Sequence, residues 1–434
     1  MRIPEVGAVI RGVGAAAARL AAPGAAGAEV RLRMALIALL LLAGEVRGAP
    51  AWAGVGAEAM RPPAGAEWLR ATALALGQQG GRLLLFGFFV CLLLGGVDTL
   101  RGRERRWPFG LAALVAVVLL GLPQLSGTTR HVHHLVWLLA AVGLARQPEH
   151  AIRAAWLLLA AVYFWPGVHK VATLGGDFFL TDHVLQNARW KWLQFGHVPP
   201  LVGALPPWAW RVGAAGVVLL ELTAPLCFAF ERGRRVAIPA LVAFHLLTEW
   251  AMGIAFPSLW LVLLALWPIG DTTTAPAGTE RRGAGPVAAV VAIVALVLAA
   301  HLAGLRGRVE GWPFACYPTF DRRAGPEMPA LRLSLTLGNG ETRVWEPWRW
   351  RDGDRQLRWG QLWALSLDRR PERRCPAIAA FVRQHQWRLG GATLLGATAE
   401  RVWLDVDPAA HGAIVRQREL CRLPAALLQP APNG

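Results

Sequence analysis

Residues 152–171 read "IRAAWLLLAAVYFWPGVHKV", an apolar run of the length that an α-helix needs to cross a lipid bilayer. Similar runs recur along the chain, and a helix is the structure that satisfies all of its own backbone hydrogen bonds in lipid. The pattern predicts a mainly α-helical fold, a polytopic transmembrane bundle of about nine spans. The runs lie at about residues 34–52, 81–98, 109–126, 131–146, 152–171, 208–230, 235–254, 256–270 and 287–305.

The composition agrees with a membrane protein. Of 434 residues, 55% are hydrophobic and 17% are charged, which is too apolar for a soluble protein of this size. The net charge of +17 comes from arginines in short runs between the apolar segments, not from one basic face. This distribution is typical of cytoplasmic loops, so we expect the lipid bilayer as a partner and no nucleic acid.

The arginine runs also predict an orientation. "RGRERR" at 101–106 and "ERGRR" at 231–235 lie on the same side of the membrane if the N-terminus is cytoplasmic. We therefore expect a multi-pass protein of the cell membrane with its C-terminal domain outside. The segment 172–207 is then external, and "DHVLQNARWKWLQFG" within it has the spacing of a helix that lies in the interface or over the mouth of the bundle.

Three regions follow along the chain. Residues 1–33 are basic and rich in Ala and Gly, which predicts a disordered cytoplasmic segment; 34–306 form the transmembrane domain; 307–434 have the composition of a small external α/β domain. In the last region "LRLSLTL", "GNG" and "ETRVW" predict a β-hairpin over 331–346. Helical patterns follow near 355–367 and 376–387, and 400–407 resembles a strand.

The five cysteines show no metal-ligand spacing, so we predict no metal site. Cys316 is expected either to pack inside the C-terminal domain or to form a disulfide with Cys375 or Cys421.

Lys170 is one of only two lysines among 45 basic residues. An arginine cannot lose its proton in a protein, whereas a lysine amine in an apolar site can act as a base. Tyr163, Gly167 and Lys170 share one helical face, and Pro166 frees backbone groups nearby. The alternative is a lysine that snorkels from the end of its span, which is also the interpretation for the second lysine, Lys191.

Histidines and carboxylates lie in three other spans. His131, His133 and His134 open the fourth span, where they form either a polar site facing Lys170 or an ordinary interfacial cluster. His245 and Glu249 share a face of the seventh span at i, i+4, and Glu221 lies in the sixth. Intramembrane ionisable groups face a cavity or each other, and the pattern leaves both possibilities open.

"YFWPGVHK" resembles the "YF-x-x-G-x-x-K" signature of the HTTM family, the membrane domain shared with vitamin K-dependent gamma-carboxylases. The preceding histidine cluster and "FHLLTEWAMGIAFPSLWL", similar to that family's "FH…IG-x-FP" span, occur in the expected order. The resemblance implies that Lys170 is the base for a reduced vitamin K-type quinone, that His133 or His134 faces it, and that His245 lines the cavity. It further implies a proton abstraction from a protein substrate, followed by carboxylation. The remaining residues expected around the quinone are Tyr163, His169, Asp177 and Glu249.

Two classes of function therefore stay open. One is an enzyme, a quinol-dependent oxygenase or carboxylase of the lyase type. The other is a non-catalytic membrane scaffold or a lipid- or quinone-binding protein. The enzyme hypothesis requires Lys170, the 131–134 histidines and His245 to converge on one cavity.

Overall fold

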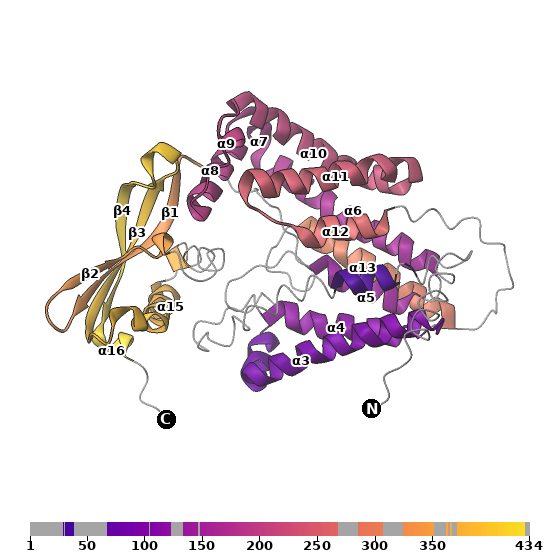
Figure 1. Ribbon diagram of the computed structural model, residues 1–434, viewed down its shortest axis with the longest axis horizontal. Helices are drawn as coiled ribbons and strands as arrows, with labels where there is room; N and C mark the ends of the chain where they lie inside the picture. The colour runs from indigo at the N-terminus through magenta and orange to yellow at the C-terminus, as the bar shows by residue number, and fades with distance from the viewer. Residues whose placement is uncertain are drawn as a thin grey trace, which may run out of the picture.

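The chain folds into a helical bundle and a small antiparallel sheet domain (Figure 1). A computed structural model describes residues 29, 31–38, 67–103, 105–122, 133–145, 148–267, 285–306, 324–350, 362, 365–366 and 371–429. The predicted disordered segment 1–33 lies almost entirely outside these residues.

The bundle has eight apolar helices, counted within the described residues. They are α3 (Trp68–Leu100), α4 (Trp107–Gly121), α5 (His133–Leu144), α6 (Pro148–Leu174), α10 (Pro207–Ala229), α11 (Glu231–Met252), α12 (Pro257–Leu266) and α13 (Gly285–Arg306). Three short helices connect α6 to α10: α7 (Asp177–Leu180), α8 (His183–Phe195) and α9 (Pro200–Gly203). Residues 31–38 are also helical.

The prediction of nine spans is not confirmed. Five helices in the described residues are long and apolar enough to cross a membrane: Gln79–Leu100, His150–Leu174, Pro207–Ala229, Glu231–Met252 and Val287–Arg306. The runs at 109–126, 131–146 and 256–270 form helices of 10–15 residues. Such helices are about 15–22 Å long at 1.5 Å per residue, which is shorter than the hydrocarbon core. The run at 34–52 is described only as far as residue 38.

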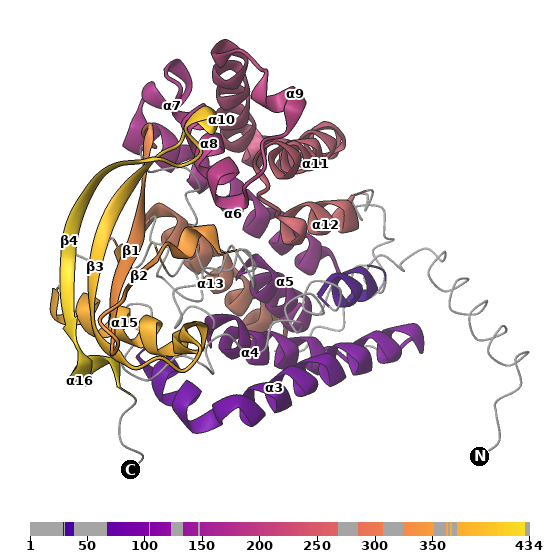
Figure 2. The same ribbon diagram turned by 60° about the vertical axis from the view of Figure 1, so that its left-hand side comes forward.

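Helix α6 lies at the centre of the bundle and packs against α5, α10 and α13 (Figure 2). Within its membrane-length window 67% of the residues are buried, against 17–33% in the other four long helices. Alanines at 154, 155, 160 and 161 keep this helix thin enough for its neighbours to approach closely. The apolar run at 152–171 therefore lies at the core of the helical bundle.

The C-terminal domain is a four-stranded antiparallel sheet in the order β2-β1-β3-β4. Its strands are β1 (Glu327–Leu337), β2 (Thr342–Trp345), β3 (Leu394–Asp405) and β4 (Ile414–Pro424). Alternate leucines of β1 at 331, 333, 335 and 337 face a core that α15 (Pro371–Gln384) covers. The remaining short elements are α16 (Ala425–Leu428) and 3-10 turns at Pro347–Arg349, Gln386–Leu389 and Pro408–Ala410.

The predicted hairpin is confirmed, since β1 pairs with β2. The helix expected near 376–387 is α15, and the strand expected at 400–407 is the second half of β3. The helix expected at 355–367 falls almost wholly outside the described residues. Strand β4 was missed, because five consecutive exposed residues at 415–419 hide its alternation.

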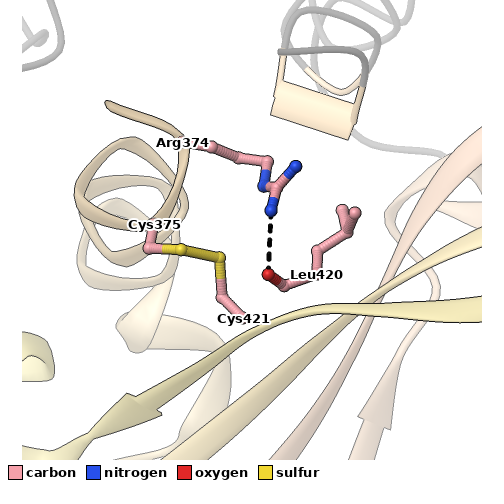
Figure 3. The surroundings of a disulfide bond; sticks show 4 residues. All are labelled: Arg374, Cys375, Leu420 and Cys421. Carbon is pink, nitrogen blue, oxygen red and sulfur yellow. Dashed lines mark hydrogen bonds between the residues drawn. A yellow bond between two sulfur atoms is a disulfide. The ribbon is translucent and has the colours of Figure 1, made fainter. Parts of the chain in front are cut away.

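A disulfide joins Cys375 on α15 to Cys421 on β4 (Figure 3). Beside it, Arg374 Nη2 donates a hydrogen bond to the Leu420 carbonyl oxygen at 3.0 Å. The prediction that Cys316 pairs with either of these cysteines is therefore wrong, because they pair with each other. The alternative for Cys316, packing inside the domain, lies outside the described residues.

Helix α8 connects the bundle to the sheet domain, which lies at one end of the bundle in both views (Figures 1 and 2). Trp190 Nε1 donates to the Gly325 carbonyl at 2.8 Å, while Trp192 Nε1 donates to the Ala251 carbonyl of α11 at 2.8 Å. Helix α8 thus packs over the end of the bundle, which is one of the two positions predicted for it.

Lys191 lies between these two tryptophans and is half-buried. Its ammonium donates to Gln194 Oε1 at 2.9 Å, and burial lowers the pKa of Lys191 to about 8.

Candidate functional site

Lys170 and Glu221 form a buried ion pair between α6 and α10. The Lys170 ammonium donates to both oxygens of the carboxylate, at 2.6 Å to Oε2. The two residues are 2% and 5% exposed, so water does not screen the pair. The structure therefore excludes the snorkelling alternative for Lys170, because its amine points into the bundle and not toward an interface.

The sequence around Lys170 explains how the pair forms. Gly167 lies one turn before it, where a Cβ atom would lie 3.0 Å from the Glu221 Cβ. A glycine here lets α10 come close to α6 without this tight contact, and the approach brings the carboxylate within reach of the amine. The ring of Phe178 on α7 covers the ammonium at 5.8 Å from the ring centroid, which adds a cation–π contact.

A second polar pair lies further along the same face of α6. The Tyr163 hydroxyl hydrogen bonds to Nε2 of His245 on α11 at 2.9 Å, and both side chains are buried. The other ring nitrogen of His245, Nδ1, has no hydrogen-bond partner among the described residues. His245 packs against the ring of Phe256 at 5.6 Å between centroids. One buried hydrogen-bonding nitrogen is thus left for a ligand.

His134 approaches the site from α5. Its Nε2 lies 2.9 Å from the Ser258 carbonyl oxygen at the start of α12, so this nitrogen carries the hydrogen. The residue is 4% exposed. Its bond holds α5 against α12 and fixes the imidazole at the edge of the same space.

These groups surround one cavity of about 490 Å³. Lys170, Glu221, Tyr163, His245 and His134 line it, and nearly all of the remaining wall is apolar. Sites for small molecules have this combination of an apolar wall with a few polar groups placed within it. Within the described residues, the structure thus brings Lys170, His245 and one histidine of the 131–134 cluster, His134, to the same cavity.

Three of the other predicted residues lie elsewhere. His169 faces α13, where its Nε2 lies 2.7 Å from the Gly304 carbonyl oxygen. Glu249 is exposed on α11 and does not line the cavity, in contrast to its predicted place beside His245 around the ligand. Asp177 is half-buried at the start of α7 and lies outside the cavity lining; its neighbour Phe178 lines the cavity instead.

His133 begins α5, but its side chain lies outside the described residues, as does all of His131. Of the two family candidates, His134 is therefore the one that the structure places in the cavity wall.

Glu221 belongs to the cavity wall, although the sequence pattern does not assign it to the Lys170 site. The available signal was that a single lysine and a carboxylate in adjacent long spans are expected to neutralise each other.

The described residues contain no group of three His, Cys, Asp or Glu side chains placed to hold a metal ion. Comparisons with known proteins add no identification: no protein-family model, no curated protein and no solved structure matches this chain.

Proposed function

We propose that this membrane protein binds a reduced quinone-type ring molecule in the cavity and removes a proton from its hydroxyl group. The observation that carries the proposal is the Lys170–Glu221 pair, a buried charge pair on the wall of a cavity that is otherwise almost entirely apolar. Ionisable groups that are gathered in a concave, largely apolar site are typical of catalytic centres.

The residues present fit such a ligand. A cavity of about 490 Å³ lies within the usual range for small-molecule sites, about 300–1,000 Å³. Its apolar wall suits a fused or substituted ring. The unpartnered Nδ1 of His245 supplies a hydrogen-bonding position for a ring oxygen.

The pair, not Lys170 alone, is the proposed proton acceptor. An ammonium has no lone pair, so within the charged pair the carboxylate of Glu221 is the group that can accept a proton. Lys170 then stabilises the anion left on the ligand oxygen, at a place where low dielectric strengthens the attraction. Tyr163 and His245 orient the ring through their fixed hydrogen bond.

The resemblance to HTTM proteins extends the proposal to a second stage. By this resemblance, the cavity would hold a reduced vitamin K-type quinone, which would supply, with oxygen, the strong base needed to take a proton from a glutamyl side chain. A protein substrate and carboxylation belong to this second stage, which goes beyond the residues of the cavity.

The disulfide supports the external location of the C-terminal domain. Disulfides persist in oxidising compartments, and the Cys375–Cys421 bond lies in the domain at one end of the bundle. We therefore propose that the cytoplasm lies at the opposite end, in agreement with the arginine runs.

A second candidate is a protein that binds a quinone or lipid without changing it. The observation that favours it is that the ionisable groups of the cavity already have protein partners: Lys170 has Glu221, Tyr163 has His245, and His134 has Ser258. A mutually satisfied polar network stabilises a fold without any chemistry.

The test separates binding from turnover in purified protein in lipid nanodiscs. Binding of a reduced vitamin K-type quinone is followed by quenching of the fluorescence of the 21 tryptophans. Turnover is followed as oxygen-dependent formation of the quinone epoxide, in which one oxygen atom enters the epoxide and the other leaves as water. We expect wild type to bind and turn over, and Glu221→Gln to bind with turnover lowered at least 100-fold.

Lys170→Arg divides the roles within the pair. An arginine keeps the charge but cannot give up its proton, so retained turnover would assign proton acceptance to Glu221. Arg211→Met, which removes an exposed pair with Asp182, is the matched control and should behave as wild type. Binding without epoxide in wild type would favour the second candidate, and absence of binding would refute both.

A further inference from the structure

We infer that the cavity opens sideways to the lipid bilayer between α10 and α11, and that its ligand carries a hydrocarbon tail that lies in this opening. The ring end of this ligand rests on the proposed function, whereas the opening and the tail rest on the surface of the two helices.

The wall of the cavity reaches the outer surface of the bundle. Gly213 and Gly216 on α10, and Ala240 and Ala243 on α11, all line the cavity and are also exposed. Both helices are long and apolar enough to span a membrane, and they lie side by side (Figure 1). Because the exposed face of a spanning helix contacts lipid, the cavity meets lipid at these four residues.

The opening is set by residue size. The two glycines are spaced by three, as are the two alanines, so each pair lies on one face of its helix. A Cβ atom added at Gly213 or Gly216 would meet nothing within 4 Å. The space in front of α10 is therefore unfilled, and a larger side chain there would occupy it without displacing the protein.

Polarity divides the cavity into two ends. The polar side chains Lys170, Glu221, Tyr163 and His245 are only 2–5% exposed and lie on the inner wall. The rim residues Leu247 and Trp250 are apolar and more than half exposed. This order matches a molecule with a polar ring and an apolar tail, whose tail remains in contact with the acyl chains outside.

The opening is tested with a photoreactive lipid, independently of any quinone. The protein is placed in phosphatidylcholine vesicles that contain a phospholipid with a diazirine on one acyl chain, and labelled residues are located by mass spectrometry. We expect labelling of cavity-facing residues of α6, Val162 and Tyr163, because an acyl chain can reach them through the opening. Gly216→Phe should lower this labelling at least fivefold.

The control is Gly87→Phe on α3, where an added Cβ atom also meets nothing within 4 Å. It should leave the labelling of α6 unchanged, and the thermal stability of both variants shows that each is folded. Equal α6 labelling in wild type and Gly216→Phe, or no α6 labelling in wild type, would overturn the opening.

The tail is tested by comparing two quinols of identical ring, with and without an isoprenoid chain, in the fluorescence assay. We expect the tailed quinol to bind at least tenfold more tightly than the tail-less one in wild type, and Gly216→Phe to bring the ratio of the two affinities to about one. If the photoreactive lipid labels α6 but neither quinol binds, the proposed function is refuted and the inferred opening still stands. Ring binding with no advantage of the tail and no α6 labelling would refute the opening and leave the proposed function.

Discussion

Removing Lys170 should destabilise the protein far more than removing both members of its ion pair. Lys170→Met leaves the Glu221 carboxylate, 5% exposed, on an apolar wall without the one side chain that donates to it among the described residues. Breaking a buried pair on one side costs about 3–5 kcal/mol, because the remaining group has lost both water and its partner. We expect a loss of unfolding free energy in this range.

The double variant Lys170→Met/Glu221→Leu removes the orphaned charge. Replacement of a buried pair by apolar side chains of similar volume is often neutral or stabilising. We expect a stability within about 1 kcal/mol of wild type, which gives a coupling energy of several kcal/mol in the double-mutant cycle. As a control, Arg211→Met removes an ion pair whose side chains are 44% and 40% exposed and should cost less than about 1 kcal/mol.

The assay is reversible unfolding in mixtures of sodium dodecyl sulfate and mild detergent, followed by tryptophan fluorescence. A Lys170→Met variant as stable as wild type would contradict the reasoning, because it would mean that water or another group satisfies Glu221. So would a double variant as unstable as the single one, because the cost would then come from lost packing and not from an unpaired charge.

Three further outcomes are expected in the same assay. Gly167→Ala should destabilise by about 1–3 kcal/mol, because the new methyl group would lie 3.0 Å from the Glu221 Cβ and force α6 and α10 apart; no change would mean that the helices separate freely. Since burial lowers the pKa of Lys191 from 10.5 to about 8, the folded state loses this proton first, so stability should rise with pH between about 8 and 10.5. Lys191→Met should remove that rise, and an unchanged slope would assign it to other groups. Cys421→Ser opens a link between residues 46 positions apart, so we expect a loss of about 2–4 kcal/mol, and a similar loss when wild type is reduced; unchanged stability on reduction would show that Cys375 and Cys421 are not joined.

The membrane character could be predicted from the sequence, but the number of spans could not. Hydropathy shows that a segment is apolar, but a helix that faces lipid and a helix that is covered by protein are equally apolar, so hydropathy does not distinguish them. The run at 256–270 illustrates the difference: its helix, Pro257–Leu266, begins at a proline and ends after 10 residues. Where the helix starts and stops depends on local backbone restrictions and packing, which an average over an apolar window does not record.

The site residues also divide into those that the sequence could predict and those that it could not. Tyr163 and Lys170 were predicted together because both lie on α6, where helical spacing fixes their shared face. Glu249 was predicted to lie around the cavity, but it does not line it. A residue four positions after His245 lies near the same helical face, yet it is offset from the centre of that face. The buried stripe of α11 runs through Leu241, His245, Thr248 and Met252, so Glu249 lies at its edge and turns outward. The rotation of a helix about its axis is set by its neighbours, and the sequence of that helix alone does not specify it.

The presence of a lysine at 170 now has two physical explanations. One is chemical, since lysine can exchange a proton and arginine cannot. The other is structural: the ammonium neutralises the buried Glu221 carboxylate, to which it donates at 2.6 Å. The pairing with Glu221 supports the structural explanation, which the sequence alone did not reveal. A lysine that neutralises a buried carboxylate contributes to stability even if it takes part in no reaction. The cavity of about 490 Å³ supports the chemical explanation, because a pair kept only for packing gains nothing from lining an unfilled space.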